Sequence, residues 1–307
     1  MLMPKQNGSP WIGTGLDFLW LELTNQCNLR CVHCYAESGP RGNEDDVLTT
    51  HDYVRLLDEA HGLGCGSVQF IGGEPTLNRD LDLLIRYARE KGFDLIEVFT
   101  NLTRLTDDLV ALFKSYRVEV ATSVYAHVAG VHDKVTTIAG SFARTVANLR
   151  RLVAAGIPVR ASVIAMDENR DIVPETMAFL RNMGVPVVGS DGIRRIGRGS
   201  HSAGSQMSEL CGQCAGARLC VGPDGRASPC IMSKAWSVGS VMQSRLAEIV
   251  CSSELQEVRE AIYREAVMGR QGTSVCQPQV CGPYNSCGPN LGPGPCAPSG
   301  CSICRPG

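Results

Sequence analysis

The stretch Cys27-Asn28-Leu29-Arg30-Cys31-Val32-His33-Cys34 places three thiols within eight residues, near the start of a 307-residue chain. It directly follows an apolar, β-prone segment, Asp17–Thr24. Three thiolates on one short loop can hold three corners of a cubane iron–sulfur cluster and leave the fourth iron open. An open coordination position is typical of a catalytic metal rather than a structural one. The alternative is a zinc site completed by His33, but the position of His33 beside Cys34 makes that geometry awkward.

Outward from this loop, β-prone and helical segments alternate through residues 1–200. The predicted strands are Asp17–Thr24, Ser67–Ile71, Asp94–Thr100, Val118–Val124, Pro158–Ala165 and Pro186–Gly189. The predicted helices are Thr49–Leu63, Leu81–Lys91, Asp107–Tyr116, Phe142–Ala155 and Ile172–Met183. This α/β alternation predicts a parallel sheet with helical crossovers, and six units suit a partial (β/α)6 TIM-like barrel. Functional groups are then expected at the carboxyl ends of the strands.

Cysteine is the unusual feature of the composition. Four of the 15 cysteines lie in residues 1–200 and eleven in residues 201–307, which predicts a barrel domain over 1–200 and a Cys-rich domain over 201–307. No signal-peptide-like run or membrane-length apolar segment is present, so a cytoplasmic location with reduced thiols is expected. Many reduced thiols indicate metal ligation, and an odd count does not fit an all-disulfide scheme. A net charge of −2 argues against nucleic-acid binding.

The segment Ile71-Gly72-Gly73-Glu74-Pro75 follows the second predicted strand. Glycines let the backbone approach a ligand, and a carboxylate can neutralise an ammonium group. Together with the Cys-x3-Cys-x2-Cys spacing of the opening loop, this segment resembles the radical S-adenosylmethionine (SAM) enzymes. The resemblance implies that Cys27, Cys31 and Cys34 bind a [4Fe–4S] cluster. It also implies that SAM chelates the open iron through its amino and carboxylate groups.

The resemblance extends to other SAM contacts. It implies that His33 covers the adenine and that the Gly-Gly-Glu-Pro segment meets the SAM ammonium. Thr100, Asn101 and Ser123 follow the third and fourth predicted strands, where polar and ribose contacts are expected, although each could be a plain loop cap. Arg195 is assigned to the cofactor site because residues 194–199 resemble the Arg-x-x-Gly-Arg-Gly end of the barrel in one subgroup. Residues 131–142 resemble that family's His-Asp…Gly-Ser-Phe connection.

The Cys-rich half resembles the C-terminal auxiliary iron–sulfur domain called SPASM, or twitch in its half-sized form. Cys214, ten residues, Gly225, four residues and Cys230 fit its opening pattern, and Cys220 is a further familiar ligand. The second half departs from the family spacing. By order, one auxiliary [4Fe–4S] cluster is expected on Cys214, Cys220, Cys230 and Cys296, and another on Cys276, Cys281, Cys287 and Cys304. Cys211 and Cys301 are spare in this scheme, and a single auxiliary cluster stays open as an alternative.

Two cysteines lie apart from these groups. Cys65, between two glycines, is expected to be a small buried residue. Cys251 has three possible roles: inert packing, a stray ligand, or a hydrogen-atom donor. In the third role, a SAM-derived 5′-deoxyadenosyl radical removes hydrogen from a carbon, and the thiol returns hydrogen to the opposite face. The return is downhill because the S–H bond is weaker than the C–H bond, and it inverts the stereocentre.

The reaction class is the least specified part of the prediction. A chain of this size with a lone thiol at position 251 resembles the radical SAM epimerases of aminoglycoside biosynthesis. An aminoglycoside epimerase is therefore the leading hypothesis. The short segment before the first strand also favours a small substrate. The alternatives are a maturase of a ribosomally made peptide, an aminocyclitol dehydrogenase, and a non-enzymatic metal-storage or scaffold protein, which the Gly-Gly-Glu-Pro segment opposes. The resemblance implies a flavodoxin- or ferredoxin-type electron donor. Acidic residues that could meet a polycationic sugar, or form a solvated loop, are Glu37, Glu44, Asp45 and Asp46.

Overall fold

The computed structural model describes residues 15–200 and 206–270. Six parallel strands form the predicted partial barrel, in the spatial order β6-β5-β4-β3-β2-β1. Their bounds are β1 Phe18–Glu22, β2 Ser67–Ile71, β3 Leu95–Phe99, β4 Glu119–Ser123, β5 Val159–Ala165 and β6 Val187–Gly192. All six carboxyl ends therefore point to the same rim, which is where a barrel of this type gathers its functional groups.

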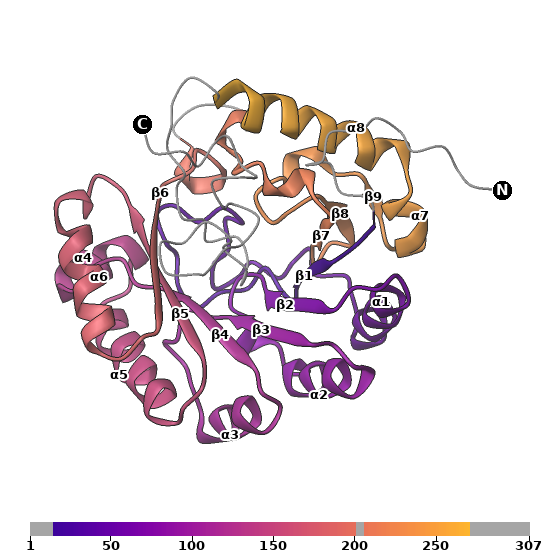
Figure 1. Ribbon diagram of the computed structural model, residues 1–307. Coiled ribbons are helices and arrows are strands. Elements are labelled where there is room, and N and C mark those ends of the chain that lie inside the picture. Colours follow the sequence, from indigo (N-terminus) through magenta and orange to yellow (C-terminus); the bar gives the residue numbers. More distant parts are fainter. Residues whose placement is uncertain (1–14, 201–205, 271–307) are drawn as a thin grey trace, which may run out of the picture.

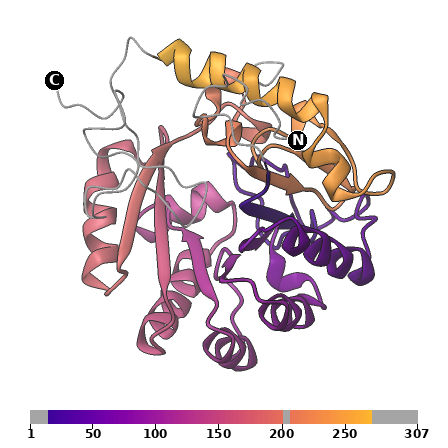
Figure 2. The ribbon, with the colours of Figure 1, turned by 45° about the vertical axis from the view of Figure 1, so that its right-hand side comes forward.

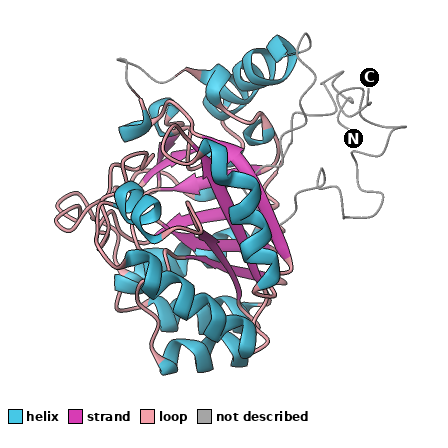
Figure 3. Ribbon diagram, turned by 90° about the vertical axis from the view of Figure 1, so that its left-hand side faces the viewer, coloured by secondary structure: helices cyan, strands magenta, loops and turns pink. Residues whose placement is uncertain are grey.

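Helical crossovers cover the outer side of this sheet (Figures 1 and 3). Their bounds are α1 Thr50–Gly62, α2 Leu81–Lys91, α3 Asp107–Ser115, α4 Ala129–Thr136, α5 Ser141–Ala154 and α6 Val173–Asn182. Local signals fix their ends: Thr49 and Asp52 form a capping box on α1, and Gly92 ends α2 in the left-handed conformation. Apolar residues of α1, α2, α3, α5, α6 and the strands build one continuous core between the two layers.

Helix α4 was not predicted from the sequence. Its eight residues include Gly130 and three β-branched residues, and no side chain caps its start, so local propensity is weak. Tertiary contacts stabilise it instead. Arg30 N donates to Thr136 O at 3.3 Å and Val32 N donates to Val135 O at 3.0 Å. The end of α4 is thus hydrogen-bonded to the loop that carries the three cysteines.

The sheet continues into the Cys-rich half. Strand β7, Arg218–Val221, pairs in parallel with β1, and β8, Arg226–Ser228, and β9, Gly239–Ser240, follow in antiparallel order. Helices α7, Leu246–Val250, and α8, Ser253–Ile262, lie beside these strands (Figures 1 and 2). The domain boundary at residue 200 stays a prediction. Strands β1 and β7 lie on either side of that boundary in the sequence but belong to one hydrogen-bonded sheet.

A second apolar cluster lies on the inner face of β1 and β2. Phe18, Trp20 and Ile71 pack there against Cys214, Cys220, Cys230 and apolar residues that include Leu210 and Ile262. Since Trp20 is paired in register with Cys220, the second group of cysteines lies on the inside of the sheet, beside the barrel. Among the described residues, no helix has the length and apolar content needed to cross a membrane.

Candidate active site

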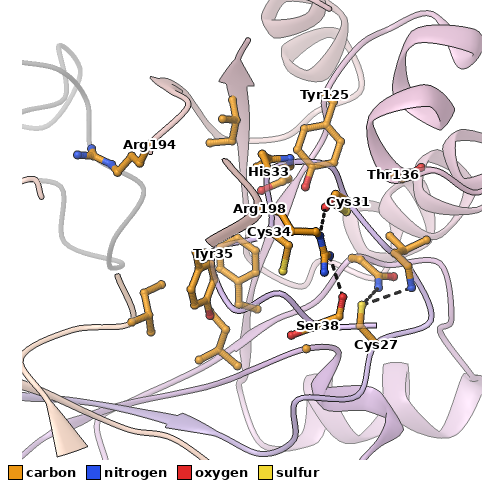
Figure 4. Close-up of a pocket in the computed structure, with 18 of the residues that line it drawn as sticks. Cys27, Cys31, His33, Cys34, Tyr35, Ser38, Tyr125, Thr136, Arg194 and Arg198 are labelled. Carbon is orange, nitrogen blue, oxygen red and sulfur yellow. Dashed lines mark hydrogen bonds between the residues drawn. The ribbon is translucent and has the colours of Figure 1, made fainter. Parts of the chain in front are cut away.

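A cavity opens at the carboxyl ends of the six barrel strands, and the three cysteines of the opening loop line it (Figure 4). Every barrel strand contributes residues at or just beyond its end. The described lining residues are Cys27, Leu29, Cys31, His33, Cys34, Tyr35, Ser38, Ile71, Gly72, Gly73, Phe99, Asn101, Ser123, Tyr125, His132, Thr136, Ile164, Asp191, Gly192, Arg194, Arg198, Ile231 and Met232. The lining therefore combines a thiol group, a largely apolar wall and a few polar side chains.

Neighbouring segments hold the cysteine loop in place. Cys27 N donates to Gly39 O at 2.9 Å, and the Asn101 amide donates to the Cys27 thiol at 3.8 Å. Leu29 N also donates to the Cys27 thiol, at 3.4 Å. Together with the bonds to α4, these contacts fix the loop before any ligand binds, which is the preorganisation that a catalytic site needs.

Arg198 also binds the loop, through three backbone carbonyl oxygens (Figure 4). Its backbone N–H donates to Cys34 O at 3.0 Å, its Nε to Cys31 O at 2.8 Å and its Nη2 to Ser38 O at 2.8 Å. The preceding residue, Gly197, has φ +57°, and a Cβ there would lie 2.4 Å from Tyr35 O. Only glycine allows this close backbone approach without a shift of the loop.

The three thiols suit a cluster better than a single ion. In residues 15–200 and 206–270, no three His, Cys, Asp or Glu side chains surround a point that one metal ion would occupy. A zinc ion needs such convergence, whereas the thiolates of a cubane cluster each bind a different iron. Burial raises the pKa of the Cys27 and Cys31 thiols to about 12, so metal binding must displace their protons.

Gly72 and Gly73 line the cavity as expected, but their immediate neighbours are protein backbone. A Cβ on Gly73 would lie 2.2 Å from Gln26 O, and one on Gly72 would lie 2.5 Å from Thr24 O. Gly73 N donates to Thr24 O at 2.7 Å and Glu74 N to Gln26 O at 2.9 Å. The glycines therefore let the second loop pack directly against the start of the cysteine loop, a contact that the sequence reasoning missed.

Glu74 does not line the cavity, although it was predicted to meet the SAM ammonium. Its carboxylate is buried and lies outside the cavity lining, where it accepts hydrogen bonds from Thr76, Thr100 Oγ1 and Asn101 N. Burial raises its pKa despite these bonds. Through these hydrogen bonds Glu74 connects the ends of β2 and β3. Thr100 takes part in this connection and does not line the cavity. Pro75 is buried and does not line the cavity either.

His33, Asn101 and Ser123 do line the cavity. The His33 ring lies edge-on to Tyr125, with centroids 4.9 Å apart, and its buried Nδ1 has no hydrogen-bond partner among the described residues. Burial and the nearby Arg198 lower the pKa of His33 to about 4, so the ring is neutral at pH 7. An orphaned polar atom on a flat neutral ring fits a base such as adenine, which offers both a stacking face and hydrogen-bonding groups.

The three arginines of residues 194–198 lie differently relative to the cavity. Arg195 is exposed and lies outside the cavity lining, whereas its neighbours Arg194 and Arg198 both line it. Arg194 forms an ion pair with Asp191 at 2.6 Å, at the end of β6. The sequence pattern pointed to this segment but could not show which of its three arginines line the cavity.

A second thiol group lies on the inner side of β1 and β7. Cys214, Cys220 and Cys230 are all buried, and the Cys214 and Cys230 sulfurs are 3.0 Å apart. Three buried thiols in one apolar cluster match the donor set of an iron–sulfur cluster. The other predicted auxiliary ligands, Cys276, Cys281, Cys287, Cys296 and Cys304, lie outside the described residues, as does Cys301.

A charged bridge between the two thiol groups was not predicted. The Tyr35 hydroxyl donates to Glu22 Oε1 at 3.0 Å, and Lys234 Nζ lies 2.6 Å from Glu22 Oε2. Tyr35 directly follows Cys34, Glu22 ends β1, and Lys234 follows Cys230 by four positions. Only the adjacency of Tyr35 to Cys34 was visible in the sequence, because the rest depends on long-range packing.

The lone cysteines fall in different environments. Cys65 is buried beside β2, which confirms the expectation of a small packing residue. Cys251 is exposed at the end of α7 and is not among the residues lining the cavity. The structure therefore does not bring Cys251 together with the SAM-site residues. The acidic residues Glu37, Glu44, Asp45 and Asp46 also lie outside the lining, and Asp46 accepts hydrogen bonds from Thr24 and Asn25.

Two family models match the chain. Residues 21–180, just over half of its length, match the radical SAM superfamily. Residues 202–282 match the SPASM iron–sulfur cluster-binding domain. These matches agree with the two thiol groups, one at the barrel rim and one beside β7.

Two curated relatives match about three fifths of the chain. Fe-coproporphyrin III synthase from Methanosarcina barkeri is 28% identical over 186 residues, 61% of this chain and 46% of that protein. The antilisterial bacteriocin subtilosin biosynthesis protein AlbA from Bacillus subtilis is 27% identical over 180 residues, 58% of this chain and 40% of that protein. The chain thus spans less than half the length of these two relatives.

A solved structure shares the fold. Streptococcus suis SuiB, bound to its precursor peptide SuiA, superposes with a TM-score of 0.66. The match covers 80% of this chain and 67% of SuiB at 14% sequence identity, so the likeness concerns the fold alone.

Proposed function

We propose that this chain, which belongs to the radical SAM superfamily and carries a SPASM iron–sulfur domain, modifies a peptide at an unactivated C–H bond. The observation that carries the proposal is the composition of the cavity at the barrel rim. It joins three cluster-ligand thiols and a largely apolar wall with a single carboxylate, and that carboxylate is already paired. SAM and its cluster, when bound, supply the 5′-deoxyadenosyl radical that removes the hydrogen atom.

The residues of the chain have separate tasks in this proposal. Cys27, Cys31 and Cys34 hold the cluster, and Arg198 and α4 hold their loop. His33, Gly72, Gly73, Asn101 and Ser123 form the SAM contacts. The apolar wall, which includes Phe99, Ile164 and Ile231, shields the reacting carbon from water and so protects the radical from side reactions.

The charge of the cavity argues against a polycationic sugar. All 31 Asp and Glu residues lie in the described parts of the chain, and Asp191 alone among them lines the cavity. Asp191 is paired with Arg194, and Arg198 adds a further positive charge. Like charges in a desolvated site repel strongly, so an aminoglycoside with several ammonium groups would bind poorly here. A neutral or acidic peptide segment meets no such repulsion.

The position of Cys251 weakens the epimerase hypothesis. The resemblance to the aminoglycoside epimerase of neomycin biosynthesis depends on a lone thiol able to return hydrogen inside the active site. An exposed thiol outside the cavity lining must move before it can reach a substrate there. The peptide proposal does not require this movement.

The relatives support a peptide substrate by analogy. AlbA is named for the biosynthesis of a bacteriocin, and SuiB was solved with a precursor peptide bound. We propose a flavodoxin- or ferredoxin-type protein as the electron donor, as the family resemblance in the sequence implies.

Substrate-dependent SAM cleavage tests the proposal. The anaerobically reconstituted chain is incubated with SAM, a reductant, and either the short peptides encoded beside its gene or a panel of aminoglycosides. We expect one peptide to increase 5′-deoxyadenosine formation and to change in mass or stereochemistry, and Cys251→Ala to retain this activity. Epimerisation of an aminoglycoside by the wild type, abolished in Cys251→Ala, would overturn the peptide proposal and restore the epimerase.

A further inference from the structure

Cys211 begins a Cys-Gly-Gln-Cys segment that ends at Cys214. Two cysteines separated by two residues form a recurrent ligand pair of iron–sulfur and zinc sites, because a tight turn brings both thiols to one side. Assignment by order leaves Cys211 spare and takes the fourth auxiliary ligand from Cys296, 66 positions after Cys230. The structure provides a nearer ligand.

Cys211 lies beside the second thiol group. Its thiol lies within hydrogen-bonding distance of the Cys214 thiol. It is also close enough to the Cys230 thiol to interact with it electrostatically. Cys230 in turn lies 3.0 Å from Cys214 and neighbours Cys220. Cys211 also packs against the same apolar cluster as the three buried cysteines. Four thiols from residues 211–230 therefore form one continuous group.

We propose that Cys211, Cys214, Cys220 and Cys230 together hold the auxiliary [4Fe–4S] cluster nearest the barrel. In this arrangement all four protein ligands come from the described part of the chain. The six cysteines between residues 276 and 304 are then all left for a further cluster.

The backbone around these four residues is firmly placed. Gly212 has φ +85°, and a Cβ there would lie 2.5 Å from Val267 Cγ2, so the Cys211–Cys214 turn packs directly on the π-helical turn Tyr263–Val267. Cys220 is fixed in β7, in register with Trp20 of β1. Cys230 N donates to Ser233 Oγ at 2.8 Å. Three separate elements thus hold the thiols in one place before metal arrives.

Chain connectivity favours the local ligand. Closing a loop costs conformational entropy that rises with the number of residues enclosed. Cys211 is three positions from Cys214, whereas recruitment of Cys296 would close a loop of 66 residues after Cys230. Cys211 therefore reaches the cluster at the lower entropic cost.

Iron analysis of single-cysteine variants tests this assignment. The full chain is prepared with Cys27, Cys31 and Cys34 all replaced by Ala, so that any remaining iron belongs to auxiliary clusters. In that background Cys211→Ala is compared with Cys296→Ala, and Cys251→Ala serves as the control because its exposed thiol is outside both groups. We expect Cys211→Ala to lose up to about four irons per chain or to convert one cluster to a three-iron form in its EPR spectrum. Cys296→Ala and Cys251→Ala should keep that cluster.

Thiol protection provides a second measurement that does not depend on the folding of a variant. The reconstituted chain with all its cysteines is alkylated under anaerobic conditions, and the labelled positions are read by mass spectrometry. We expect Cys251 to be labelled and Cys211 to be protected until a chelator removes the iron. Rapid labelling of Cys211 in the iron-loaded chain would overturn the proposal. An unchanged cluster in Cys211→Ala, whether or not Cys296→Ala loses one, would overturn it as well.

Discussion

At the scale of single residues, Gly197 shows how much the cluster loop depends on one missing side chain. Its positive φ and the 2.4 Å approach to Tyr35 O leave no room for a Cβ. We predict that Gly197→Ala destabilises the iron-loaded protein by more than about 2 kcal/mol, because strain and a backbone clash add. It should also weaken iron binding by Cys27, Cys31 and Cys34. Thermal unfolding and iron content measure the two effects.

Gly130 provides the matched control for this substitution. It lies in α4, where a Cβ would have no neighbouring atom within 4 Å, and its φ is not in the left-handed range. Gly130→Ala should leave stability unchanged or raise it by about 0.5–1 kcal/mol, because alanine is the better helix former. Equal effects of the two substitutions would contradict the close-packing explanation.

The ion pair between Lys234 and Glu22 leads to a second prediction at this scale. Glu22 is fully buried, and Lys234 is its only charged partner among the described ion pairs. Lys234→Met should destabilise the protein by about 1–3 kcal/mol, because it leaves a buried carboxylate oxygen without its partner. The double variant Glu22→Gln/Lys234→Met should recover part of the loss, since no buried charge then stays unpaired. Denaturant unfolding of both variants checks this, and identical losses would argue against it.

At the scale of elements, Asp133 explains the His-Asp…Gly-Ser-Phe connection. From α4 its carboxylate accepts hydrogen bonds from Gly140 N, Ser141 Oγ and Phe142 N at 2.6–2.8 Å, at the start of α5. Although its partial burial opposes ionisation, these bonds hold the pKa of Asp133 below its usual value. The side chain thus caps α5 and joins it to the helix that supports the cysteine loop.

The stability provided by Asp133 should depend on pH. Because its folded pKa lies below the unfolded value of about 3.9, the stabilisation is complete above that value and is lost as the pH falls through the folded pKa. We predict that Asp133→Asn is less stable than wild type by about 1 kcal/mol at pH 7. The difference should begin to shrink only below about pH 4 in urea unfolding. Lys134→Ala, at an exposed neighbour, should show no such change, and a pH-independent deficit for Asp133→Asn would contradict the cap.

Elements with strong local signals could be predicted, and elements held by distant contacts could not. The barrel strands are rich in β-branched and apolar residues, and α1 and α2 carry recognisable ends, so the bounds of these two helices were predicted to within two residues. Helix α4 and strand β7 lack such signals. They form because α4 meets the cysteine loop and β7 meets β1, which are contacts between segments distant in sequence.

The candidate site, too, could be predicted where local spacing specified it and not where it depended on contacts between distant segments. The spacing of Cys27, Cys31 and Cys34 predicted a cluster loop, and these cysteines line the cavity together with His33, Asn101 and Ser123. The side-chain directions of Glu74, Arg195 and Cys251 were not predictable, because each depends on packing against another element. The charge of the cavity lining favours a peptide over an aminoglycoside as the substrate. That charge could not be predicted, because it depends on side chains from the ends of different strands.

At the scale of the whole molecule, one sheet joins the two thiol groups that we propose as iron–sulfur sites. Strand β1 leads directly into the loop of Cys27, Cys31 and Cys34, and β7 beside it carries Cys220. The bridge from Tyr35 through Glu22 to Lys234 spans the space between them. Movement of the SPASM domain relative to the barrel would break this sheet, so we expect the two sites to keep a fixed separation during the reaction.

We expect SAM to occupy the open position beside Cys27, Cys31 and Cys34. The most direct measurement is electron–nuclear double resonance of the reduced cluster in the presence of SAM labelled with ¹⁵N at its amino group. We predict a ¹⁵N coupling in the wild type and in Cys251→Ala, and none in Cys34→Ala. Absence of ¹⁵N coupling in the reduced wild-type cluster at saturating SAM would show that the SAM amino group does not bind the open iron.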